Sequence, residues 1–115
     1  MAATVFPDGA QTTFTALAGT SATACYVVGT TDKTNAVYLL GVQVSDSTGS
    51  VATAANVVIY RNPTSWVLVP TATGYPTAGF NLEWIAHWPI RLKTGDEVRV
   101  TGANGHHVIV SYLPI

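Results

Sequence analysis

The chain has 115 residues, of which 48% are hydrophobic and only 10% are charged, with a formal net charge of −1. This length predicts a single domain, and the lack of any basic block argues against a protein that binds nucleic acid. No apolar run approaches the ~18 residues that a membrane span needs. The first residues carry no basic region followed by an apolar one, so we expect no secretory signal and folding in a cytoplasm.

The first twelve residues, interrupted by Pro7-Asp8-Gly9, predict an N-terminal arm, and residues 13–115 predict the domain itself. The arm is either a frayed terminus or an ordered segment that lies on a neighbouring subunit. After it, short alternating or β-branched runs separated by Gly, Pro, Asn and Asp predict strands at residues 13–18, 22–28, 36–45, 56–60 and 66–69. In the third of these, the apolar face is predicted to consist of Tyr38, Leu40, Val42 and Val44.

The strongest alternation lies in residues 81–100, where apolar side chains fall on every second position from Leu82 to Leu92. Successive side chains of a strand point to opposite faces, so this spacing predicts one buried face that includes Trp84 and Trp88. Pro89 cannot donate a backbone hydrogen bond, and we therefore expect an edge position, a bulge or a bend there. A turn at residues 93–96 follows, and Val98 and Val100 resume the alternation.

The last two strands are predicted to form a hairpin, for which two registers are possible. A two-residue Asn104-Gly105 turn would pair Gly102 with His107. A three-residue loop with Gly105 in the left-handed conformation would pair Gly102 with His106. We favour the second register because it places all the apolar residues on one face: Val98, Val100, Val108, Val110 and Tyr112. It leaves Ile109 and Leu113 as an exposed apolar pair that is a candidate contact surface.

Together these patterns predict an all-β fold, a single-domain β-sandwich of jelly-roll type with about eight antiparallel strands. Cys25 is the only cysteine, so no disulfide can form within the chain, and its strand-like surroundings predict a small core residue. The predicted core comprises Leu82, Trp84, Trp88, Ile90, Leu92, Val98, Val100, Val108 and Val110, faced by Leu40, Val42 and Ile59.

No group of residues predicts catalysis, a cofactor or a metal ion. His106 and His107 are adjacent in a strand and point to opposite faces, so at most one of them can join His87 in a site. Asp96 and Glu97 are separated in the same way, and the chain has no nucleophile elbow or phosphate-binding glycine loop. We therefore expect no enzyme activity, no catalytic residues, no cofactor and no metal ligands.

Aromatic residues offer a possible platform for a sugar ring. Trp84 and Trp88 share the predicted core face, which leaves Trp66 and Tyr75 as the remaining aromatic candidates. Tyr75 lies in the longest irregular loop, at residues 70–79, and is the better candidate for a contact outside the domain.

The C-terminal third resembles small β-sandwich structural proteins of tailed bacteriophage virions. The resemblance rests on PIRLKTGDEVRV at residues 89–100, a strand, a Gly-Asp turn and a Val-x-Val strand, followed by the closing strand VIVSYL at residues 108–113. The composition, rich in Thr, Ala and Gly and poor in charge, is also similar. The resemblance implies assembly by surface contact without catalysis, commonly as a capsid cement or decoration subunit, and offers no functional residues to transfer.

These observations lead us to expect a virion structural protein, assembled in the host cytoplasm, that stabilises the head as a homo-oligomer. Its expected partners are the major capsid protein or other virion proteins, without nucleic acid or membrane. The candidate contact residues are Val5, Phe6, Tyr75, Ile109 and Leu113. The alternatives are a tail-fibre or neck-associated module that binds a glycan or receptor, as a lectin does, and a small cupin-like enzyme.

Overall fold

The computed structural model describes residues 6–31, 35–46, 54–69 and 82–115. Its regular structure in these ranges consists of strands, and no helix there is long and apolar enough to cross a membrane. The strands are β1 (Gln11–Ala16), β2 (Thr23–Val27), β3 (Ala36–Asp46), β4 (Asn56–Arg61), β5 (Thr64–Val69), β6 (Leu82–Lys93), β7 (Glu97–Thr101) and β8 (His106–Pro114).

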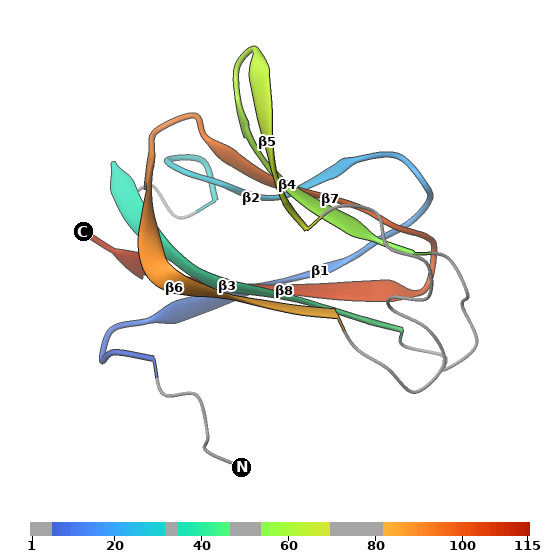
Figure 1. The fold of residues 1–115 in the computed structure, drawn as a ribbon, viewed down its shortest axis with the longest axis horizontal. Helices are drawn as coiled ribbons and strands as arrows, with labels where there is room; N and C mark the ends of the chain where they lie inside the picture. The colour runs from blue at the N-terminus through green and yellow to red at the C-terminus, as the bar shows by residue number, and fades with distance from the viewer. Residues whose placement is uncertain (1–5, 32–34, 47–53, 70–81) are drawn as a thin grey trace.

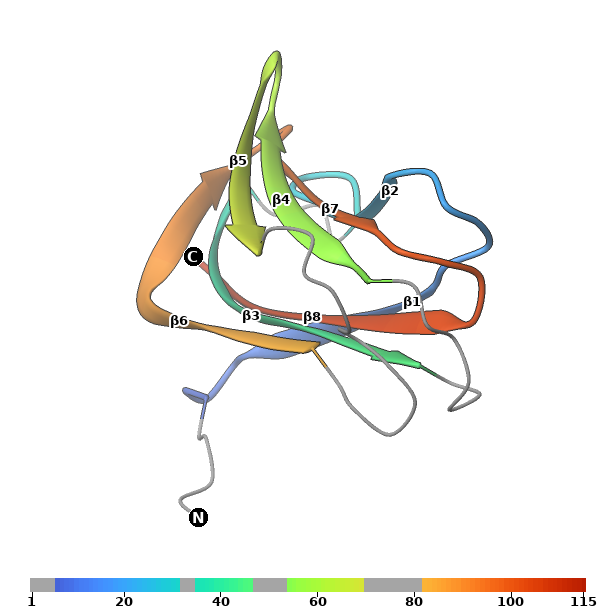
Figure 2. The ribbon, with the colours of Figure 1, turned by 45° about the vertical axis from the view of Figure 1, so that its right-hand side comes forward.

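The eight strands form two four-stranded antiparallel sheets that pack face to face (Figures 1 and 2). We call the sheet with the order β1-β8-β3-β6 sheet A, and the sheet with the order β2-β7-β4-β5 sheet B. Of the consecutive strands, only β4 and β5 pair as a hairpin; every other step along the chain moves to the opposite sheet. The predicted all-β sandwich of about eight strands is confirmed, and this strand order is the one expected of a jelly roll.

The core lies between the sheets and is made of alternate residues from both. The Tyr26 and Tyr112 rings stack across it, with their centroids 4.3 Å apart. Cys25 is buried there, as predicted, and burial raises the pKa of its thiol to about 11. The predicted core residues that are buried are Leu40, Val42, Ile59, Leu82, Leu92, Val98, Val100, Val108 and Val110.

The predicted hairpin between the last two strands is wrong, because β7 belongs to sheet B and β8 to sheet A. The chain crosses from one sheet to the other at residues 102–105, where Gly105 adopts a φ of 98°. The valines of both strands nevertheless face the core, since each sheet turns its apolar face towards the other. Alternation reports which residues are buried, but not which sheet a strand joins.

β6 bends sharply and carries sheet A up along one side of the sandwich (Figure 1). Gly41 of β3 pairs with Ile85 and Leu39 pairs with Ile90, so residues 86–89 of β6 lie opposite Leu40 alone. The bend or bulge expected at Pro89 is thus confirmed, and β6 is also an edge strand of its sheet.

The bend overturns the prediction that Trp88 is a core residue, since this side chain is 84% exposed. Leu82 and Leu92 are buried on the predicted face, so the period of two holds on either side of the bend and fails only within residues 86–89, where β6 has extra residues opposite Leu40. Trp84 and Ile90, on either side of the bend, are only partly buried against the core.

The irregular pairing also corrects the predicted face of β3. Val37 and Leu39 point into the core before the bulge, and Val42 and Val44 point into it after the bulge. Tyr38, predicted on the buried face, is half-buried, and Leu40 is buried beside the bend but lies outside the main core cluster.

Candidate functional site

The outer face of sheet A carries several apolar side chains that lie outside the core, including the predicted contact residues Ile109 and Leu113. Directly opposed residues of an antiparallel sheet share a face, so the observed pairings define rows across the four strands. One row runs Phe14, Ile109, Gln43 and Glu83, and the next runs Thr12, Ser111, Gly41 and Ile85.

The segment before β1 lies against this face. A Cβ atom placed on Gly41 would lie 3.5 Å from Cζ of Phe6, an ordinary contact distance, and a tighter 3.1 Å from the carbonyl oxygen of Trp84, so the Phe6 ring lies directly over Gly41. A Cβ placed on Gly9 would lie 3.6 Å from Cδ1 of Leu113. Phe6 is thus half-buried near Gly41, and Leu113 is half-buried near Gly9.

Two shallow hollows flank Ile109 on this face. The first, of about 200 Å³, is lined by Phe6, Gly41, Ile85 and Ile109 among others. The second, of about 390 Å³, is lined by Phe14, Ile109 and His107 among others. Phe14 at its edge is 76% exposed, and Ile85 is 44% exposed. Such side chains are suited to insert into, or accept, the apolar surface of a partner protein.

Three of the predicted contact residues, Phe6, Ile109 and Leu113, come together on the outer face of sheet A. The other two, Val5 and Tyr75, lie outside the described residues. Sequence reasoning missed Phe14 and Ile85. The signal for Phe14 was present, because a lone aromatic residue between Thr13 and Thr15 gives a strand with no second large apolar residue on that face.

The histidines do not form a site together. His106 is fully buried, whereas His107 is exposed on the opposite face of β8, as their adjacency predicts, and His87 is exposed at the bend of β6. Within the described ranges, no three His, Cys, Asp or Glu side chains lie close enough together to hold a metal ion.

His106 fixes the crossing between β7 and β8. Its Nδ1 accepts a hydrogen bond of 3.1 Å from the backbone N–H of Ala103, which requires the neutral ring, while its Nε2 is buried with no hydrogen-bond partner among the described residues. The ring packs on Gly102, where a Cβ would come within 2.5 Å of Nδ1. Burial lowers the pKa of His106 below its ordinary 6.5, and the charge of Asp46, its neighbour in the β3–β8 register, opposes this shift.

We predict that His106 makes the fold sensitive to acid. Because its pKa is lower in the folded than in the unfolded state, the unfolded chain binds more protons below pH 6.5 and stability falls as pH drops from 6.5 through the folded pKa. In thermal unfolding at pH 5 to 7, His106→Asn should flatten this part of the pH dependence. His107→Asn, at the adjacent exposed position, is the control and should retain the slope. An unchanged slope in His106→Asn would contradict the assignment.

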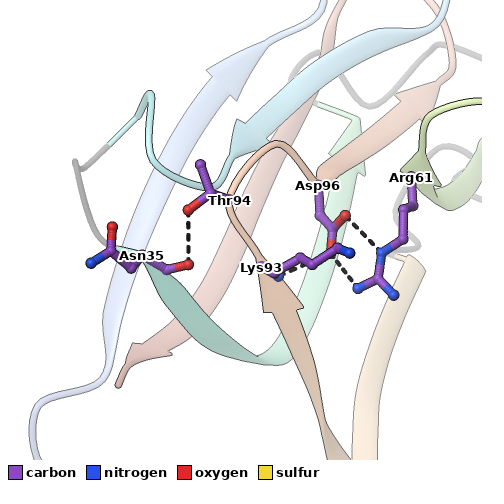
Figure 3. Close-up of polar contacts among 5 residues, drawn as sticks. All are labelled: Asn35, Arg61, Lys93, Thr94 and Asp96. Atoms are coloured by element: carbon purple, nitrogen blue, oxygen red, sulfur yellow. Dashed lines mark hydrogen bonds and ion pairs between the residues drawn. The ribbon is translucent and has the colours of Figure 1, made fainter.

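A buried carboxylate holds the turn between β6 and β7 (Figure 3). Asp96 is 2% exposed and accepts hydrogen bonds from Arg61 Nε at 2.8 Å, from Arg61 Nη2, and from the backbone N–H of Lys93 at 2.9 Å. Burial alone would raise the pKa of Asp96, but the bonds from Arg61 and Lys93 outweigh it and lower the pKa below its ordinary value.

The neighbouring acidic residue has a different partner. Glu97 accepts a hydrogen bond of 2.9 Å from Arg99, whose guanidinium lies 3.7 Å from the centre of the Tyr60 ring. Asp96 and Glu97 are therefore separated, as their adjacency predicts, and each is engaged by an arginine. Their arrangement stabilises the fold and offers no pair of carboxylates for acid–base chemistry.

Comparison with models of known protein families gives no match, and a search among curated proteins gives none either.

Proposed function

We propose that this chain is a structural subunit of a bacteriophage virion, of the cement or decoration type, which binds the outer surface of the head. The observation that carries the proposal is the outer face of sheet A, where Phe14, Ile85 and Ile109 gather around two hollows. The charged side chains that β6 places on this face, Glu83, Arg91 and Lys93, lie at the edge of the sheet. The resemblance of residues 89–100 and 108–113 to phage structural proteins supports the viral setting.

The outer face of sheet A is a narrow surface. The principal extents of the domain are 38 × 37 × 20 Å, and the view down the shortest of these axes shows both sheets edge-on (Figure 1). A specific interface needs roughly 800 Å² on each partner, so contact with the head must use most of this face. Exposed aromatic side chains contribute much of the binding energy of an interface, and Phe14, on the edge strand β1, is 76% exposed.

The proposal predicts that the protein cosediments with heads assembled from the major capsid protein of the same genome. Binding should saturate at a fixed number of copies for each head. Phe14→Asp should weaken it about 30-fold, which corresponds to the loss of about 2 kcal/mol from one aromatic anchor.

Ala24→Asp is the matched control, because Ala24 is exposed on an edge strand of sheet B and lies on the other side of the molecule. It should bind heads as the unchanged protein does. If neither the unchanged protein nor the control binds heads, the proposal is wrong; if all three proteins bind equally, the outer face of sheet A is not the contact.

A glycan-binding module of a tail fibre or neck is the second candidate, and the exposure of Trp88 favours it. A tryptophan that is 84% exposed at a strand bend presents a flat apolar ring of the kind that stacks on sugars. This function predicts saturable binding to a glycan array that Trp88→Ala abolishes and Phe14→Asp leaves intact, the reverse of the pattern expected for head binding.

A further inference from the structure

Sheet B ends in the strand β5, whose outer edge has no neighbouring strand among the described residues. The inner edge of β5 pairs with β4. An edge strand presents unpaired backbone N–H and C=O groups, which form hydrogen bonds readily with another strand. Figures 1 and 2 show the β4–β5 hairpin projecting from the body of the sandwich, so this edge is accessible.

β5 lacks most of the devices that normally protect an edge. Proteins block edges with charged residues, prolines, bulges or covering segments. β6, the edge of sheet A on the same side, has Pro89, the flanking charges Arg91 and Lys93, and its bend. β5 has the sequence TSWVLV, without charge or proline, and its one irregularity lies at Leu68 towards its end.

Large apolar side chains of β5 are also exposed at this end of the sandwich. Trp66 pairs with Ile59 and so lies on the same, core-facing side of sheet B. Ile59 is 6% exposed, whereas Trp66 is 58% exposed, because the opposite sheet does not extend over it. Val67, on the outer side, is 62% exposed. Both faces of the strand therefore carry large apolar side chains in water.

We infer that β5 pairs with β5 of a second copy of this chain, in antiparallel orientation about a two-fold axis, to form one continuous eight-stranded sheet. The uncharged, mostly apolar composition of β5 favours a second copy of the chain as its partner. An uncharged strand meets its own copy without like-charge repulsion, and a two-fold axis brings the same unpaired groups and the same Trp66 together from both sides. Trp66 then gains from its counterpart the cover that sheet A does not provide. This inference is independent of head binding.

Sedimentation velocity over about 1–100 µM tests it, since a small interface of this kind is expected to dissociate in that range. The unchanged protein should show a monomer–dimer equilibrium. Val67→Lys should raise the dissociation constant about tenfold or more, because the two-fold axis brings the two introduced like charges close together across the paired strands. Thr12→Lys, which places the same charge on the edge strand β1 of sheet A, is the control and should dimerise normally.

Hydrogen exchange supplies a second measurement that does not depend on a variant. The backbone amides of residues 65–68 should become more protected as the concentration rises, while those of β1 should not change. A protein that is monomeric throughout the range, or a dimer that Val67→Lys leaves intact with no added protection in β5, would overturn the inference. Either result would leave the test of head binding unaffected.

Discussion

Asp96→Asn is expected to lower the free energy of unfolding by about 1.5–3 kcal/mol, the range for hydrogen bonds that involve a charged group. The carboxylate joins the end of β4, through Arg61, to the turn that carries the chain from sheet A to sheet B. An amide can accept only part of this set and brings an N–H₂ group towards the guanidinium. The melting temperature should fall by about 10 °C or more.

Glu97→Gln is the matched control, since it changes the next residue in the same way. The side chain of Glu97 is 21% exposed, against 2% for Asp96, and its partly exposed pair with Arg99 is of a kind that contributes about 0.2–1 kcal/mol. Equal losses in the two variants, measured by urea unfolding, would show that the buried carboxylate has no special role.

The lowered pKa of Asp96 adds a dependence on pH. A group whose pKa is lower in the folded state contributes stability that is present above its ordinary pKa, near 3.8, and is lost as pH falls through the folded pKa. The difference in stability between Asp96→Asn and the unchanged protein should therefore be constant near neutral pH and shrink below pH 3.8.

Leu92→Ala should cost about 2–5 kcal/mol, while Trp88→Ala should change stability by no more than about 0.5 kcal/mol. Both residues belong to β6 and both fall on the same predicted face, but Leu92 is 1% exposed and Trp88 is 84% exposed. Truncating the first leaves a cavity in the core; truncating the second removes a side chain that is already in water.

Thermal and urea unfolding of the two variants, made in the same background, measures this difference. Comparable losses for both would mean that Trp88 packs inside the domain and that the bend in β6 is wrong. A loss for Trp88→Ala alone would contradict the burial of Leu92 as well.

The sequence was sufficient for the fold class because burial imposes its period of two on each strand separately. Val98, Val100, Val108 and Val110 were correctly assigned to the core. Which sheet each strand joins depends on pairings between distant residues, and the alternation is silent on these. The hairpin expected between β7 and β8 failed for this reason: an Asn-Gly turn also suits a chain that crosses between sheets.

The bend in β6 shows a second limit. Pro89 predicted an irregularity, but not how many residues it involves. The four residues 86–89 lie opposite Leu40 alone, and only the pairing with β3 shows that the period of two fails within them. Trp88 was consequently placed in the core, although it is among the most exposed large side chains of the described residues.

The candidate contact surface was predicted only in part. Ile109 and Leu113 follow from the alternation of β8, because their neighbours Val108 and Val110 had to face inwards. The exposure of Phe14 could be predicted from its own strand, but that Phe14 and Ile85 share a face with Ile109 follows only from the pairing of β1 with β8 and of β3 with β6. The Arg61–Asp96 pair could not be predicted for the same reason, because its two residues are 35 positions apart in the chain.

The heat stability of heads with and without the protein tests the proposed function most directly. A cement subunit binds only the intact shell, so it must raise the temperature at which heads break open or release DNA, in proportion to the sites that it fills. We predict that heads lacking the protein gain stability when it is added back, and that Phe14→Asp restores much less than Ala24→Asp at the same concentration. Heads that bind the unchanged protein but break open at the same temperature as bare heads would contradict a cementing role.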